Sequence, residues 1–235
     1  MRYSPEEAMM HEKVMKMVPT FKDMITTLSK DPVQLKAFIA YLGSAAASVR
    51  QEDTASLKNN ILVYILNDLR EDYLDPPVSK MDTKICVMDM HTKFLNNWIE
   101  FMEKVKDGTY CVKTSGWPTF LYDLVANQYD RKNKDHSLFC GPLIQVFRHI
   151  FTGPLLAFGS QRKGTKPSKA EIHQMMAVTG QTIAYAAVQT HFALSSVKSW
   201  SSKDGEFNYE VFFNNIMDLF ETLRPMTRTC GLLKP

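Results

Sequence analysis

Polar side chains that can exchange protons lie in an otherwise apolar segment near residues 180–196. Tyr185 and Gln189 fall on one helical face, and His191 falls on a neighbouring face among aliphatic residues. Buried polar groups need hydrogen-bond partners, and most form networks with a purely structural role. The alternative is the polar end of an apolar pocket, where His191 or Tyr185 donates or accepts protons. We take His173, Tyr185, Gln189 and His191 as candidate catalytic residues.

Two neighbouring residues complete this hypothetical ligand site. Phe192 and Ser196 lie along the same helical face as Tyr185, so we expect them to contact a ligand. His173 has no acid–base partner nearby, because Glu171 is two positions away and points elsewhere on a helix. Glu171 is also explained by a capping box with Ser168.

A basic segment offers a different function. Four cations lie between Gln161 and Lys169, namely Arg162, Lys163, Lys166 and Lys169. Such a cluster can contact phosphates, and the alternative prediction is an interaction module that binds protein or nucleic acid through this loop. No aromatic residue is interleaved with the cations, which argues against a platform that stacks single-stranded bases. A solvated surface loop explains the same pattern without any partner.

The patterns of several other site classes are missing from the sequence. No two of the six histidines are four residues apart, and the four cysteines contain no C-x-x-C pair. The acidic segment Asn67–Asp75 lacks a D-D-x-x-D run, so its resemblance to the magnesium site of terpene cyclases is slight. In the G-x-x-x-x-G-T segment at Gly159–Thr165, Thr165 stands where a P-loop needs lysine. We therefore predict no metal site and no cofactor.

Capping residues and prolines predict an all-α fold. Helices are expected to begin at Ser4-Pro5, Asp31-Pro32, Asp53, Trp117-Pro118, Gly141-Pro142, Ser168, Thr179 and Asn208, and a long helix is expected over Ile85–Met102. No run of alternating β-branched residues predicts a strand. The expected architecture is a single globular bundle of about eight to nine helices, with a central alanine-rich helix near residues 180–196.

Length and composition predict one helical domain over residues 1–235. The 235 residues are 45% hydrophobic and 23% charged, as is usual for a globular protein. Pro76-Pro77 could separate an N-terminal layer, residues 1–75, from a C-terminal part, residues 78–223. No signal peptide or membrane span is expected, and scattered cysteines favour reduced thiols in the cytoplasm or nucleus. The sequence does not predict an oligomeric state.

The second half of the chain resembles an uncharacterised domain family of mushroom-forming fungi, over roughly residues 120–221. The residues that carry the resemblance are Gly141-Pro142-Leu143, Ile150–Pro154, Glu171-Ile172-His173, Ile183–Ala187, Gln189, Phe192–Ser196, Trp200 and Asp218–Glu221. The chain departs from the family pattern at Gly180, where the family has proline, and at Thr222–Pro235, which replaces a tryptophan-rich stretch. The resemblance implies a fungal, intracellular, helical protein and transfers no catalytic residue.

Two functions of different classes remain. The first is a pocket for a small apolar molecule, which could extend to a cofactor-independent cyclase or isomerase that uses histidine and tyrosine as acid–base groups. Fourteen methionines and fourteen phenylalanines could line such a pocket or form an ordinary core. The second is the interaction module at the basic loop. We favour the first, because polar groups lie on a helix that should be buried.

Overall fold

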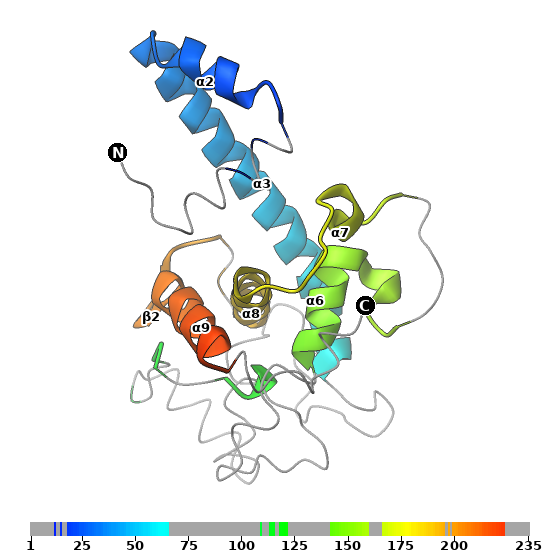
Figure 1. Cartoon of the computed structure of the whole chain (residues 1–235). Coiled ribbons are helices and arrows are strands. Elements are labelled where there is room, and N and C mark those ends of the chain that lie inside the picture. Colours follow the sequence, from blue (N-terminus) through cyan, green and yellow to red (C-terminus); the bar gives the residue numbers. More distant parts are fainter. Residues whose placement is uncertain are drawn as a thin grey trace, which may run out of the picture. The chain divides into compact units, whose positions relative to one another are not determined.

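The computed structural model describes residues 12, 15, 18–65, 109, 113–115, 118–121, 142–159, 166–195, 197 and 199–223. These residues are mostly helical, which agrees with the predicted all-α class (Figure 1). Their α-helices are α2 (Phe21–Leu28), α3 (Pro32–Ile65), α6 (Pro142–Thr152), α7 (Lys169–Ile172), α8 (Gly180–Leu194) and α9 (Tyr209–Leu223). Two short 3-10 helices are η1 (Thr119–Leu121) and η3 (Pro154–Leu156). None of the described helices is long and apolar enough to cross a membrane.

The number of helices differs from the prediction. The described residues form six α-helices, and not the eight to nine that the capping signals predicted. The predicted helices at Ser4-Pro5 and over Ile85–Met102, and most of the one after Trp117-Pro118, lie outside the described residues. Two further differences lie in the N-terminal part of the chain: α2 was not predicted, and two predicted helices are merged into one.

The helices predicted to start at Pro32 and at Asp53 are one continuous helix, α3. Asp31 caps its beginning as predicted, because its Oδ1 accepts hydrogen bonds from the backbone N–H groups of Val33 and Gln34 at 2.9 and 3.2 Å. After Pro32, the helix contains no further proline and a single glycine, Gly43. A glycine inside a helix lowers its stability by about 1 kcal/mol relative to alanine, which is not enough to end the helix. Asp53 is therefore an interior residue whose carboxylate is free for tertiary contacts.

The contacts of the chain form two compact units, Met1–Gln51 and Glu52–Pro235. In the first unit, α2 is joined to the first part of α3, and the rings of Phe21 and Phe38 lie 6.5 Å apart. No side chain of α2 is fully buried. The second unit contains the hydrophobic core and every residue of the site described below.

Helix α8 is the centre of the second unit. It contacts both α6 and α9, and it lies between them in Figure 1. Its alanines at 184, 186, 187 and 193 are almost completely buried, and their small side chains permit close approach of the neighbouring helices. A Cβ atom on Gly180 would lie 3.1 Å from Cδ1 of Phe220, so the start of α8 packs tightly on α9. The predicted central alanine-rich helix is confirmed, with its end at Leu194.

Side-chain caps set the boundaries of the helices around α8. Ser168 and Glu171 form the predicted capping box at α7. Thr179 caps α8 by accepting a hydrogen bond from the N–H of Thr182. Asn208 caps α9, because its Oδ1 accepts from the N–H groups of Glu210 and Val211. The predicted cap residues are correct at these three helices.

A small β-hairpin was not predicted. Strands β1 (Lys203–Asp204) and β2 (Phe207–Asn208) pair in antiparallel register around a turn with Gly205 at φ 57°. Two-residue strands are too short to produce the alternating pattern from which a strand is predicted. The hairpin places Phe207 against Phe212 on either side of the Asn208 cap, with ring centroids 5.1 Å apart, which is the arrangement of a hydrophobic staple.

His191 is part of this core. Its side chain is 0% exposed, and its ring stacks on Phe207 with centroids 3.7 Å apart. Nδ1 pairs with the hydroxyl of Tyr209 at 3.2 Å, whereas Nε2 has no hydrogen-bond partner among the described residues. Burial lowers the pKa of His191 from 6.5 to about 3, so the ring is neutral in the native protein.

The buried His191 should make the protein less stable in acid. In the unfolded chain the His191 ring is protonated below about pH 6.5. In the native state it is protonated only below about pH 3. The free energy of unfolding should therefore decrease as the pH falls, by roughly 1 kcal/mol per pH unit from this residue. Urea unfolding of His191→Leu between pH 7 and pH 4.5 should show a shallower pH dependence, by close to one proton. Val188→Ala, a core change without a titrating group, should keep the original slope, and an unchanged slope in His191→Leu would contradict the assignment.

Candidate functional site

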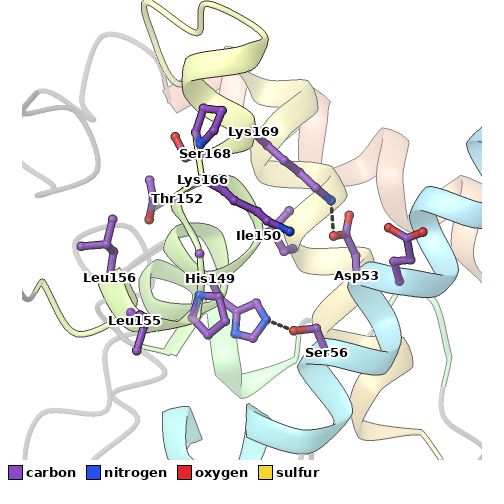
Figure 2. Close-up of a pocket in the computed structure, with 14 residues that line it drawn as sticks. Asp53, Ser56, His149, Ile150, Thr152, Leu155, Leu156, Lys166, Ser168 and Lys169 are labelled. Carbon is purple, nitrogen blue, oxygen red and sulfur yellow. Dashed lines mark hydrogen bonds and ion pairs between the residues drawn. The ribbon is translucent and has the colours of Figure 1, made fainter. Parts of the chain in front are cut away.

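A pocket of about 450 Å³ opens in the second unit between α3, α6, η3 and the segment 166–169 (Figure 2). Ile150, Leu155 and Leu156 supply apolar surface. Hydroxyl and imidazole groups come from Ser56, Thr152, Ser168 and His149, and charges come from Glu52, Asp53, Lys166 and Lys169. A volume of this size and a mixed lining are typical of small-molecule sites.

Helix α3 contributes a polar stripe to the site. Asp53, Ser56, Asn60 and Tyr64 are separated by three or four residues, so they lie along one side of the helix. The neighbouring side carries Leu57 and Ile61, which are buried in the core. Because the apolar side is buried in the core, the polar stripe is held at its edge, where Ser56 and Asp53 reach the pocket.

His149 joins α6 to this stripe. Its Nε2 lies 2.7 Å from Oγ of Ser56, and its Nδ1 lies 2.7 Å from the hydroxyl of Tyr64. The imidazole is 4% exposed, yet it contributes to the pocket surface. Both ring nitrogens are therefore bonded to hydroxyl groups of one helix, one turn on either side of Asn60. Figure 2 shows the bond between His149 and Ser56.

Burial keeps these groups neutral. Desolvation lowers the pKa of His149, with Asp53 opposing the shift and Lys169 adding to it. Desolvation also raises the pKa of the Tyr64 hydroxyl. At neutral pH the ring of His149 therefore carries one N–H and one lone pair, and Tyr64 keeps its proton.

Exposure decides which ring nitrogen of His149 carries the proton. Tyr64 is 6% exposed, and Nδ1 of His149 is the acceptor within reach of its hydroxyl among the described residues. Ser56 is half-buried at the pocket, where water or a ligand can accept its hydrogen. An unmade hydrogen bond costs more at the buried hydroxyl. The favoured arrangement is therefore Tyr64 O–H donating to Nδ1, Nε2–H donating to Ser56, and Ser56 O–H directed to the pocket.

A second polar contact at the pocket is the ion pair between Lys169 and Asp53, which neutralises the carboxylate. The carboxylate of Asp53 also accepts a hydrogen bond from the hydroxyl of Tyr185 at 2.8 Å. The side chain of Asp53 is 9% exposed and that of Lys169 is 32% exposed. A buried carboxylate is tolerated only with such partners. This pair joins α3, α7 and α8 on one side of the pocket (Figure 2).

The predicted catalytic residues are distributed over different environments. His191 lies in the aromatic core, and Gln189 is 0% exposed and accepts a hydrogen bond from Thr54 at 2.7 Å. The hydroxyl of Tyr185 donates a hydrogen bond to Asp53, which lines the pocket, and His173 is exposed at the end of α7. None of these four residues lines the pocket.

The other predicted contact residues are also separated. Phe192 is 3% exposed and packs against Trp200, with ring centroids 5.1 Å apart, and Ser196 lies outside the described residues. Of the basic cluster, Lys166 and Lys169 line the pocket, and Arg162 and Lys163 lie outside the described residues. Lys169 is paired with Asp53, so its charge is already partly neutralised.

Sequence reasoning missed Ser56, Tyr64 and His149. A signal existed in the spacing of Asp53, Ser56 and Tyr64, which repeats on one side of a helix beside the aliphatic residues 57 and 61. A second signal was a histidine next to Val146 and Ile150 in a short apolar helix. Neither pattern says which helices meet, so the partners could not be paired from sequence.

These observations define a mostly helical protein with a small-molecule-sized pocket built around a buried histidine. The model of a family of unknown function (DUF6698) matches residues 44–234, and the chain belongs to that family. Membership of an uncharacterised family is thus confirmed, and the match extends well beyond the predicted residues 120–221. The comparison with curated proteins found no match, and neither did the comparison with solved structures.

The ion pair at the pocket can be tested by a double-mutant cycle. Asp53→Asn and Lys169→Met should each destabilise the protein, and the pair should show a coupling energy of about 1–2 kcal/mol, because one partner is nearly buried. Chemical denaturation of the two single variants and the double variant measures this coupling. Lys166→Met is a matched control, since Lys166 lines the same pocket but forms no ion pair or hydrogen bond with Asp53, and its coupling with Asp53→Asn should be a few tenths of a kcal/mol. Equal coupling for both lysines would contradict a specific pair.

The tautomer of His149 can be observed directly. In protein labelled with ¹⁵N-histidine, we expect the His149 signal of a ring protonated at Nε2 and unprotonated at Nδ1. Tyr64→Phe removes the donor to Nδ1, so the proton should shift toward Nδ1 and leave Nε2 to accept from Ser56. Tyr41→Phe, which changes an exposed tyrosine, should leave the spectrum unchanged. A wild-type ring protonated at Nδ1 would refute the proposed direction of the chain.

Proposed function

We propose that the pocket binds a small organic molecule through an acceptor oxygen, which receives the hydrogen of Ser56. The observation that carries this proposal is the chain Tyr64–His149–Ser56, which begins at a buried hydroxyl and ends at the pocket. A chain of hydrogen bonds polarises its members, so its last donor is stronger than an isolated hydroxyl. A carbonyl, carboxylate or phosphoryl oxygen suits such a donor.

The apolar side of the pocket supports a ligand with a hydrocarbon part. Leu155 is 71% exposed, and together with Ile150 and Leu156 it offers a surface that a ligand could cover. Removing such a surface from water contributes about 25 cal/mol per Å². The polar chain would then orient the ligand, and the apolar surface would supply most of the affinity.

The hydrogen-bond chain Tyr64–His149–Ser56 is better suited to bind and polarise the acceptor oxygen of a ligand than to deliver a proton to it. Complete transfer of a proton to the ligand would finally deprotonate Tyr64, whose pKa is raised by burial. Nor does the favoured tautomer make Ser56 a nucleophile, because Nε2 already carries a proton and cannot act as its base. The site therefore resembles the donor half of a carbonyl-activating enzyme, in which fixed donors stabilise charge on an oxygen.

Matched probes can test the role of Ser56. Acetophenone offers a carbonyl oxygen that ethylbenzene lacks, so saturation-transfer NMR should show binding of acetophenone and weaker binding of ethylbenzene. In Ser56→Ala the advantage of acetophenone should fall several-fold, because the hydrogen bond to its oxygen is lost. Ser201→Ala, a change of an exposed serine away from the pocket, should have no effect. Equal binding of acetophenone to wild type and Ser56→Ala would refute the proposal.

A further inference from the structure

Among the described residues, the pocket lining carries two acidic and two basic side chains, and one of each has no ion pair or hydrogen bond with another described residue. Asp53 and Lys169 neutralise one another. Glu52 and Lys166 also line the pocket, and neither side chain forms an ion pair or hydrogen bond with a described residue. Within the described part of the chain, one unpaired carboxylate and one unpaired ammonium group therefore lie at the same opening, together with the donor Ser56 and the apolar surface of Leu155 and Leu156.

Each single-charge ligand would leave a mismatch at this opening. An organic anion would be attracted by Lys166 and Ser56 but repelled by Glu52, and an organic cation would meet the opposite problem. A neutral ligand would use neither charge. In Figure 2 the side chain of Lys166 extends toward α3, and its ammonium group is drawn between the Asp53–Lys169 pair and the His149–Ser56 pair. A carboxylate placed there would receive two donors of different kinds, an ammonium group and a hydroxyl.

We propose that the ligand is a zwitterion of the amino-acid type with an apolar side chain. Its carboxylate would accept from Ser56 and Lys166, its ammonium group would face Glu52, and its side chain would cover the surface of Ile150, Leu155 and Leu156. This inference rests on the proposed function, because it uses Ser56 as a donor to an acceptor oxygen. It adds the class of ligand and two residues that determine specificity.

Three related probes separate the two charges. L-phenylalanine carries both, N-acetyl-L-phenylalanine retains only the carboxylate, and L-phenylalaninamide retains only the ammonium group. Isothermal titration of the full chain at low salt should give an affinity for phenylalanine at least fivefold higher than for either derivative. The expected effect is moderate because Glu52 and Lys166 are exposed and their fields are screened by solvent.

Two variants assign each charge to its residue. In Glu52→Gln, phenylalanine and its N-acetyl derivative should bind equally, because the partner of the ammonium group is lost. In Lys166→Gln, phenylalanine and the amide should bind equally. Lys203→Gln, which changes an exposed lysine away from the pocket, should leave all three affinities unchanged. Glu52 and Lys166 are exposed, so neither change should prevent folding.

The outcomes are distinguishable from those of the preceding test. If the N-acetyl derivative or the amide binds as tightly as phenylalanine, or if none of the three binds, the zwitterion proposal is overturned. Acetophenone binding that depends on Ser56 would in that case still support the pocket as a site for acceptor oxygens. If acetophenone binding does not depend on Ser56, the proposed function fails independently of the charge preferences.

Discussion

The contact between α3 and α6 at the pocket depends on one buried imidazole that has a hydrogen-bond partner at each ring nitrogen. His149 is held between two hydroxyl groups of α3, at 2.7 Å on each side. These two hydrogen bonds link α6 to two positions of α3 that are eight residues apart. The pocket then lies where the partly exposed end of this chain reaches the surface.

The two buried histidines of the described part illustrate different uses of the same side chain. His191 stacks on Phe207 and leaves Nε2 without a partner among the described residues, so it contributes to packing and lowers stability in acid. His149 has hydroxyl partners at both nitrogens and a surface on the pocket. Both are neutral at physiological pH, but of the two only His149 is hydrogen-bonded to a residue that lines the pocket.

The ion pair of Asp53 with Lys169 complements this chain. It removes a negative charge from the pocket, and its third partner, Tyr185, ties α8 to α3. Without it, a carboxylate close to His149 would favour the protonated imidazolium. The pair thus helps to keep His149 neutral, which the direction of the hydrogen-bond chain requires.

Local sequence signals were sufficient for the caps and for the identity of the central helix. Asp31, Ser168, Thr179 and Asn208 act through atoms within three residues, so their roles follow from neighbours in the chain. The same local logic failed at Asp53, which has the sequence of a cap but lies within α3 and binds Lys169, 116 residues away. An aspartate can cap a helix or pair with a distant residue, and the choice depends on tertiary contacts that are not visible in the neighbouring sequence.

The sequence by itself determined the helical class, several helix starts and a core around residues 180–194. Hydrophobic spacing and capping are short-range properties, so they can be recognised from the order of neighbouring residues in the sequence. Only the tertiary structure decided that the candidates on α8 are divided between the core and the support of Asp53. It also decided that His149 meets Ser56 and Tyr64 at the pocket, because these partners are 93 and 85 residues away and a helical pattern does not specify which helices meet.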